Sequence, residues 1–366
     1  MKVAILGSRG IPARYGGYDT LVEELSAGLV ECGAFEVTVY CRKAYFVSWP
    51  EAYRGAYLVY LSFPRMKAAE SIVHSFLSSL HVLTQKVDLI YFVDPANAPF
   101  CLLLRLCGKK VVLHTDGLGW KRQKWGPLAR RYYKFAEWIG VRAANALITD
   151  NPAMQAYYKK EYNADSFYIP YGAESGYGVD DTIYEQIGLV PSRYLLVVAR
   201  LEPDNNTTLI IEEYVKSKVT MPLVIVGDSP YDAEYMLRLR ELANERVLFV
   251  GRINDQAKLN GLYKGAYLYI HGHEVGGTNP SLLRAMQAAT APTVIDVPFN
   301  TSVVGNDGFI FSKEPGNLSG LLQCLVKETD KIKKIGLNAK ARVEENFRWE
   351  DVVNRHKLLF EKVTVS

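Results

Sequence analysis

Short apolar segments alternate with amphipathic helical patterns along the whole chain, and this alternation constrains the fold more than any other feature of the sequence. Residues 3–6 have the composition of a buried strand, and in the following segment, residues 20–30, Leu21, Leu25 and Leu29 recur at helical spacing. Strands that alternate with helices are typical of parallel sheets covered by helices. The sequence therefore predicts an α/β fold with doubly wound sheets.

The alternation occurs in two series. The strands of the first series are predicted at residues 3–6, 37–40, 57–61, 89–93, 111–114 and 146–148. Those of the second are predicted at residues 195–199, 223–226, 247–250, 267–270, 293–295 and 309–311. Residues 169–181 are rich in Gly, Pro and Tyr, which is typical of a linker.

A length of 366 residues also favours two domains. We expect a first Rossmann-like domain at residues 1–172 and a second at 181–348. We expect a C-terminal helix at residues 349–366, and we expect this helix to cross back onto the first domain. Two such domains facing each other would form a central cleft, and doubly wound sheets bind ligands beyond the carboxyl ends of their strands.

The composition excludes several classes of protein. A hydrophobic content of 49% is typical of a globular chain, and a net charge of +4 is too small to indicate nucleic acid. The five cysteines are scattered and lack metal-binding spacing, so we expect reduced thiols. The chain begins with a strand-like segment rather than a signal peptide, and no apolar run has the roughly 18–20 residues that span a bilayer. A cytoplasmic protein is expected.

The segment 271–286 is the strongest candidate for binding phosphate. It follows a predicted strand and contains Gly276 and Gly277, then the capping types Thr278, Asn279 and Ser281, with Pro280 at a first helical position. A glycine loop that leads into a helix presents backbone N–H groups and the positive end of the helix dipole to an anion. The alternative is an ordinary connection in which the glycines only turn the chain.

The loop after the first strand, residues 7–18, contains four glycines together with Arg9 and Arg14. The glycines allow close approach of the backbone to a ligand, and the arginines supply positive charge for an anion. The spacing matches neither the dinucleotide-binding fingerprint nor a P-loop. The alternative is a flexible surface loop.

His114 and Asp116 lie at the end of another predicted strand. Such a pair could orient a sugar hydroxyl or move a proton, although a histidine at a strand end is often structural.

A basic and aromatic stretch follows at residues 120–138. Its cations are Lys121, Arg122, Lys124, Arg130, Arg131 and Lys134. Basic side chains beside Trp and Tyr suit an anionic membrane surface or a lipid-diphosphate acceptor. The alternative is a solvated basic helix whose aromatic side chains face the core.

Arg200 follows the first strand of the second series, directly before a helix. An arginine there can bind a diphosphate through two hydrogen bonds and neutralise its charge as it leaves. The chain contains no Asp-any-Asp triplet. Arginine and a helix N-terminus would therefore replace the divalent metal used elsewhere, so no metal and no cofactor are expected.

Four motifs together resemble the retaining glycosyltransferases of the GT-B fold, family 4, and within it the bacterial rhamnosyltransferase-like subgroup. They read GSRGIPARYGG at 7–17, DGLGWKRQKWG at 116–126, ARLEPDNN at 199–206 and VGGTNPSLL at 275–283. The resemblance implies transfer of a sugar, often rhamnose, from a dTDP- or UDP-linked donor to a lipid-linked saccharide of capsule or cell-wall synthesis. It also implies a location at the inner face of the plasma membrane, in peripheral contact with anionic lipid.

The resemblance further implies a set of site residues. Catalytic roles fall to Arg200, Asp116 and His114. The donor is expected to contact Gly10, Arg200, Asn205, Gly251, Arg252, Glu274, Gly276, Gly277, Thr278, Asn279, Ser281 and Arg284. The acceptor is expected to contact Arg9, Arg14, Tyr15, Gly16, Gly17, Asp116, Trp120, Lys121 and Arg122. Retention would proceed by attack on the front face, with the departing phosphate taking the acceptor's proton.

The sequence departs from the family at a position that matters for the donor. The family's turn carries a glutamate that binds the ribose hydroxyls, and this chain has Arg284 there. The ribose contact would be lost or supplied by Glu274. Active transfer with altered donor contacts, an unusual donor, and a non-catalytic glycosyltransferase-like partner subunit all remain open. A phosphorylase or sugar-nucleotide epimerase is a weaker alternative.

Overall fold

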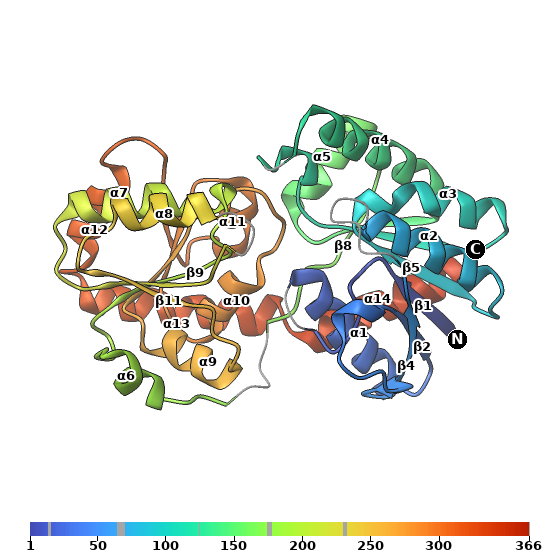
Figure 1. Cartoon of the computed structure of the whole chain (residues 1–366), viewed down its shortest axis with the longest axis horizontal. Coiled ribbons are helices and arrows are strands. Elements are labelled where there is room, and N and C mark those ends of the chain that lie inside the picture. The colour runs from blue at the N-terminus through green and yellow to red at the C-terminus, as the bar shows by residue number, and fades with distance from the viewer. Residues whose placement is uncertain (14–15, 64–69, 124, 174–177, 230–232, 366) are drawn as a thin grey trace. The chain divides into compact units, whose positions relative to one another are not determined.

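The computed structural model describes all residues except 14–15, 64–69, 124, 174–177, 230–232 and 366. The chain divides into two compact units (Figure 1). Unit 1 comprises Met1–Gly172 together with Trp349–Ser366, and unit 2 comprises Ala173–Arg348. Each unit contains one sheet, so each is described by itself.

The sheet of unit 1 has the strand order β3-β4-β2-β1-β5-β6-β7-β8. All neighbouring strands are parallel except the short pair β3 and β4. The strands are β1 (Lys2–Leu6), β2 (Glu36–Arg42), β3 (Ala52–Tyr53), β4 (Ala56–Leu61), β5 (Leu89–Val93), β6 (Val111–Thr115), β7 (Ala146–Thr149) and β8 (Phe167–Tyr168). The helices are α1 (Gly17–Glu31), α2 (Glu70–Leu83), α3 (Ala98–Leu106), α4 (Pro127–Ala143), α5 (Pro152–Tyr162) and α14 (Trp349–Val365). Single 3₁₀ turns are η1 (Lys43–Tyr45), η2 (Pro95–Asn97) and η3 (Gly119–Lys121).

Helices α1 and α14 share a core with one face of this sheet. Leu25 and Leu29 of α1 and Phe360 of α14 are fully buried against alternate strand residues such as Ile5 and Val39. A β-carbon added to Gly28 would lie 2.5 Å from a methyl group of Val353, so the glycine allows the two helices to approach closely. Helix α14 therefore belongs to unit 1.

The sheet of unit 2 has the strand order β11-β10-β9-β12-β13-β14, and all its neighbours are parallel. The strands are β9 (Leu195–Val198), β10 (Leu223–Val226), β11 (Val247–Gly251), β12 (Leu268–His271), β13 (Pro292–Ile295) and β14 (Phe309–Phe311). The helices are α6 (Thr182–Ile187), α7 (Thr207–Ser217), α8 (Ala233–Leu242), α9 (Gln256–Gly265), α10 (Pro280–Gln287), α11 (Pro298–Val304), α12 (Asn317–Leu325) and α13 (Thr329–Asn346), with a 3₁₀ turn η4 (Pro203–Asn205).

Two parallel, helix-covered sheets confirm the predicted fold class. The predicted strands all form, and their ends differ from prediction by at most two residues. Strands β3 and β8, which have two residues each, are not predicted from the sequence. Strands this short are too brief for an apolar run or an alternating pattern to be recognised.

Candidate functional site

The sheet of unit 2 has a topological switch point between β9 and β12. The chain proceeds from β9 to β10 and β11 on one side, and from β12 to β13 and β14 on the other. In open α/β sheets, the loops after the two strands at such a point diverge and leave room for a ligand. Here these loops carry Arg200 and the segment 272–279.

The loop after β9 is held by its own polar groups. The side-chain amide of Asn205 donates to the carbonyl of Arg200 at 2.6 Å, and Asn205 is buried. The Asn205 side chain therefore braces the turn that presents Arg200. The Arg200 guanidinium, 37% exposed, lies 3.7 Å from the Glu202 carboxylate. The pairing leaves part of the guanidinium exposed to solvent.

The loop after β12 ends in a capped helix start. Asn279 is the N-cap of α10, and its side-chain oxygen accepts from the amide and the hydroxyl of Ser281 at 3.0 and 2.8 Å. Pro280 occupies the first turn, as expected from its fixed φ angle. Tyr269 donates to the Ser281 hydroxyl at 2.9 Å and thereby ties the cap to β12. The predicted strand–glycine loop–helix arrangement is present, with Gly277 and Thr278 buried and Gly276 partly exposed.

Hydrogen bonds join the two loops at the switch point. The Asn206 amide donates to the carbonyl of Gly272 at 2.8 Å and to the Glu274 carboxylate at 3.3 Å. The backbone amide of Glu274 donates to the carbonyl of Asp204 at 3.1 Å. Lys313 donates to the Glu274 carboxylate at 2.5 Å. The structure therefore brings Arg200, Glu274 and the start of α10 to one edge of the sheet.

Gly251, the last residue of β11, and Arg252, the first residue of the following loop, lie at the same end of the sheet. Gly251 has φ +71° and accepts from the Gly227 amide at 2.9 Å. A β-carbon on Gly227 would lie 1.8 Å from the carbonyl oxygen of Ala199, so this position requires glycine. The sequence analysis did not single out Gly227.

Unit 1 has its switch point between β1 and β5. In the loop after β1, the Arg9 guanidinium lies 3.4 Å from the buried Asp19 carboxylate, which also accepts from the Arg9 amide at 3.0 Å. A β-carbon on Gly10 would clash with Cys41. Gly16 and Gly17 form the start of α1. Arg14, Tyr15 and Lys124 lie outside the described residues.

Two carboxylates lie at the carboxyl ends of the adjacent strands β5 and β6. The Asp116 carboxylate accepts a hydrogen bond from the Tyr171 hydroxyl at 3.0 Å, and the backbone amide of Asp116 donates to the Tyr18 hydroxyl at 2.9 Å. Asp94 follows β5 with φ +73°, a strained value for a residue other than glycine. Burial, together with the nearby charge of Asp116, raises the pKa of Asp94 to about 6.

Asp94 was missed in the sequence analysis. The available signal was its position directly after the apolar strand 89–93, but only the adjacency of β5 to β1 shows that this loop lies at the switch point.

His114 lies beneath these carboxylates. Its side chain is fully buried, accepts or donates a hydrogen bond with the Tyr91 hydroxyl at 2.5 Å, and stacks on Tyr171 and His356. Burial and the neighbouring His356 hold the pKa of His114 well below its usual range. A neutral, enclosed imidazole favours the structural alternative for this residue.

The basic and aromatic stretch separates into two parts. Lys134 lies 4.3 Å from the Trp120 ring centroid and forms an ion pair with Glu161, so it is part of a local cluster. The Trp120 indole donates to the Tyr157 hydroxyl at 3.1 Å, and Lys121 is exposed beside it. Arg122 is partly exposed. The stretch thus combines packed aromatic side chains with exposed cations.

Comparisons with known proteins agree with this geometry. Residues 180–342 match the family model "Glycosyl transferases group 1", and residues 1–174 match a domain of unknown function, DUF1972. The matched region covers most of unit 2, which is therefore similar to group 1 glycosyltransferase domains.

The curated relatives of the chain are distant. The chain is 22% identical to O-antigen chain mannosyltransferase C of Escherichia coli over 98% of both chains. It is 28% identical to the uncharacterized glycosyltransferase MJ1069 of Methanocaldococcus jannaschii over 42% of each chain, so that match spans less than half of the relative. These comparisons support glycosyltransferase activity.

Solved glycosyltransferase structures share the fold of the whole chain. Sucrose-phosphate synthase from Thermosynechococcus elongatus superposes with a TM-score of 0.84 at 18% identity, covering 100% of this chain and 99% of that one. Anabaena HepE, solved in complex with UDP-glucose, superposes with a TM-score of 0.74 at 15% identity, covering 100% of both chains. The fold is therefore GT-B.

The side chain of Arg284 in unit 2 points toward α9. Its guanidinium donates to the side chain of Asn260 at 2.6 Å and to the side chain and carbonyl of Gln256 at 2.7 and 2.8 Å. The guanidinium also lies 5.6 Å from the Tyr263 ring centroid. In this chain Arg284 therefore ties α10 to α9.

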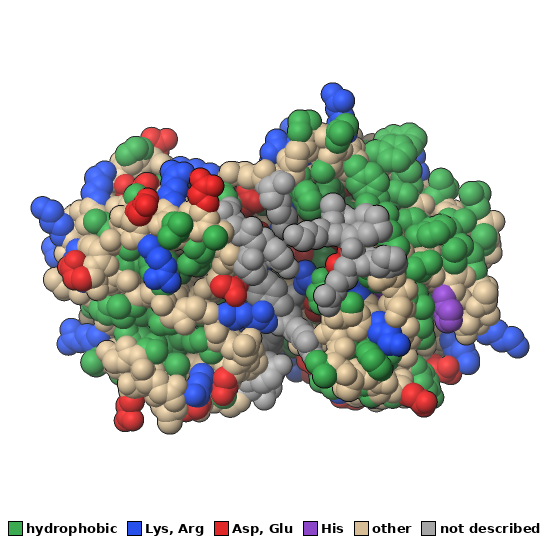
Figure 2. All heavy atoms as spheres, viewed as in Figure 1, with side chains coloured by type: hydrophobic (Ala, Val, Ile, Leu, Met, Phe, Trp, Pro, Cys, Tyr) green, Lys and Arg blue, Asp and Glu red, His purple; other side chains and the backbone are tan. Residues whose placement is uncertain are grey.

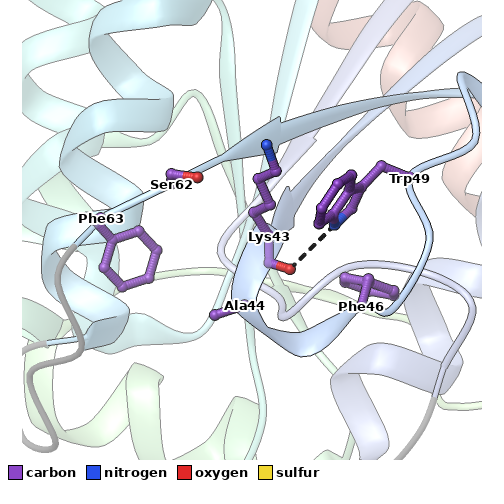
Figure 3. Close-up of a pocket in the computed structure, with 6 residues that line it drawn as sticks. All are labelled: Lys43, Ala44, Phe46, Trp49, Ser62 and Phe63. Carbon is purple, nitrogen blue, oxygen red and sulfur yellow. Dashed lines mark hydrogen bonds between the residues drawn. The ribbon is translucent and has the colours of Figure 1, made fainter.

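A pocket of about 300 Å³ lies in unit 1 at the carboxyl ends of β2 and β4 (Figure 3). It is lined by Lys43, Ala44, Phe46, Trp49, Ser62 and Phe63. The Lys43 ammonium lies 4.3 Å from the centroid of the Trp49 ring, and the indole donates to the Lys43 carbonyl at 3.4 Å. This pocket is not predicted from the sequence, because its residues come from two loops separated along the chain.

Within the part of the chain that the structure describes, no helix is long and apolar enough to cross a membrane.

Proposed function

We propose that the chain is a retaining glycosyltransferase that needs no metal and moves a sugar, rhamnose in our assignment, from a nucleotide diphosphate to a lipid-linked saccharide at the membrane surface. The observation that supports this proposal is the edge of unit 2, where Arg200 and the capped start of α10 meet at the switch point. A guanidinium and a helix N-terminus can bind a diphosphate without a metal ion. UDP-glucose bound to the similar HepE supports a nucleotide-sugar donor.

In this proposal Arg200 stabilises the charge that develops as the bond between the sugar carbon and the diphosphate oxygen breaks. The acceptor hydroxyl forms the new bond to the same carbon, and its proton passes to the departing phosphate. Asp94 and Asp116 accept hydrogen bonds from acceptor hydroxyls. Aromatic walls with a few polar groups are typical of sites for organic ligands, so we assign the pocket beside Trp49 to the acceptor saccharide.

The test has two parts. Calorimetry with dTDP, UDP and GDP is expected to show micromolar binding of one nucleotide. Release of that nucleotide from the matching sugar donor, with membrane extract as acceptor, is expected to follow. Binding without any release, with extracts that support a known transferase, would contradict the proposed transfer.

A non-catalytic partner subunit is the second candidate, because Arg284 replaces the family's ribose-binding glutamate. Arg284 is anchored to α9, so the ribose would have to be bound by other groups, and Glu274 supplies a carboxylate in the two joined loops. If none of dTDP, UDP and GDP bound, the result would favour a non-catalytic partner subunit.

A further inference from the structure

Seven large apolar side chains lie exposed on three successive helices of unit 1. Their exposed fractions lie between 43% and 79%. They are Phe76 and Leu80 of α2, Leu102 and Leu106 of α3, and Leu128, Phe135 and Trp138 of α4. Single exposed apolar side chains are normal, whereas a contiguous set marks a site of association. We call this set the α2–α4 face.

Contacts between the three helices place them side by side. The ring of Phe76 on α2 lies 5.9 Å from that of Phe100 on α3. A β-carbon on Gly140 of α4 would lie 2.9 Å from that of Ala98 on α3, so these two helices pack closely. Figure 2 shows hydrophobic side chains gathered over α2, α3 and the neighbouring part of α4.

On α4, apolar and cationic side chains share one stripe. Leu128, Arg131, Phe135, Trp138 and Arg142 follow one another at intervals of three or four residues, which places them on one side of the helix. The rings of Phe135 and Trp138 stack at 6.2 Å, and the Arg142 guanidinium lies 4.5 Å from the Trp138 centroid. Aromatic rings flanked by arginine are typical of helices that lie in a membrane interface.

The charge of these helices complements an anionic surface. Arg105 on α3 and Arg130, Arg131 and Arg142 on α4 are exposed. Helix α3 contains no acidic residue, and Glu137, the acidic residue of α4, is buried and accepts hydrogen bonds from two tyrosines. A second copy of this chain would bring like charges together, whereas anionic phospholipid would neutralise them.

We propose that the α2–α4 face docks on a bilayer that contains anionic phospholipid. Its aromatic and leucine side chains enter the interface, and its arginines contact the phosphate groups of the lipids. The proposal deepens the proposed function by giving unit 1 a defined surface toward the membrane that holds the acceptor. Docking itself requires neither donor nor transfer.

The test uses the full chain and vesicles of phosphatidylcholine, alone or mixed with phosphatidylglycerol. We compare the wild type with the double variant Phe135→Ser/Trp138→Ser. The matched control is Leu237→Ser/Leu337→Ser, which removes side chains of similar exposure from α8 and α13 of unit 2. Wild type and control are expected to sediment with the anionic vesicles. The Phe135→Ser/Trp138→Ser variant is expected to bind them at least about tenfold more weakly. Arg130→Glu/Arg131→Glu is expected to weaken binding to the anionic vesicles as well.

Three results would overturn the proposal. These are no vesicle binding by the wild type, equal binding by wild type and the Phe135/Trp138 variant, or wild-type dimers that the same substitutions dissociate in the absence of lipid. Calorimetry with nucleotides on the same preparations separates this proposal from the proposed function. Vesicle binding by a chain that binds no nucleotide would support docking and contradict transfer.

Discussion

At its switch point unit 2 presents a guanidinium and a capped helix start. Unit 1 instead presents the carboxylate of Asp94 at its switch point and that of Asp116, which is bound by Tyr171, at the end of the neighbouring strand β6. The same topological rule applies to both sheets, because the strand order reverses between β1 and β5 in unit 1 and between β9 and β12 in unit 2. The side chains at the edges differ in charge and in hydrogen-bonding capacity. Cationic donors suit a diphosphate and carboxylate acceptors suit sugar hydroxyls, so a shared topology carries two complementary chemistries.

The largest expected effect comes from removing the cation of unit 2. Arg200→Ala is expected to lower the transfer rate by roughly two to four powers of ten, because it removes the charge that stabilises the leaving diphosphate. Arg193→Ala is the matched control, since Arg193 is exposed and precedes the same strand at its opposite end. Initial rates at saturating donor and acceptor measure the effect. If Arg200→Ala retained the wild-type turnover rate, the assignment of the diphosphate site to unit 2 would be wrong.

The next effect belongs to unit 1. Asp94→Asn is expected to lower kcat/KM for the acceptor by about ten- to a hundredfold at pH 8, because a neutral amide accepts more weakly from a sugar hydroxyl. The raised pKa of Asp94, about 6, makes the carboxylate charged above that pH and neutral below it. Wild-type kcat/KM should therefore fall as the pH drops through about 6, and the variant should lack this fall. Asp88→Asn, at the opposite end of β5, should behave like the wild type.

The pH dependence of the free energy of unfolding gives a second test of the raised pKa of Asp94. The pKa is higher in the folded chain than the ordinary value of 3.8, so the folded state holds the proton more tightly. The Asp94 carboxyl therefore contributes its full stabilisation of the folded state below about pH 4, and this contribution is lost as the pH rises through about 6. Urea unfolding should show that Asp94→Asn is more stable than the wild type at pH 8, with the difference vanishing near pH 4. An unchanged profile would mean that Asp94 is not desolvated.

A smaller effect is expected at Arg284. Arg284→Met keeps much of the side-chain volume but removes the hydrogen bonds to Asn260 and Gln256. We expect a loss of about 1–2 kcal/mol in the free energy of unfolding. Arg284→Glu should lose more, because it places a carboxylate beside the carbonyl of Gln256. If Arg284→Glu instead gained nucleotide affinity with no loss of stability, Arg284 would act in the donor site rather than between α9 and α10.

The difference between the two units also explains what the sequence could predict. Strand and helix patterns with cap residues are local, so the α/β fold and the Asn279–Pro280 helix start were predictable from the chain alone. The direction of a long side chain is not local. Arg284 directly follows the glycine-turn motif but points to α9, and His114, two residues before Asp116, is enclosed by Tyr91 and His356. Asp94 joins the edge of unit 1 only because β5 pairs with β1.

The smallest effect is expected at Glu274, where the chemistry of unit 2 comes closest to that of unit 1. The Glu274 carboxylate is already bound by Lys313 and Asn206, and the Lys313 pair is partly exposed. Glu274→Gln should therefore change stability by less than about 1 kcal/mol. If this carboxylate also binds the ribose, nucleotide affinity should fall by less than about tenfold. Lys313→Met is the paired variant, because it frees the carboxylate and should leave or raise that affinity. Equal losses in both variants would indicate that the ion pair shapes the loop and that Glu274 contacts no ribose, which would leave carboxylate recognition of hydroxyls to unit 1.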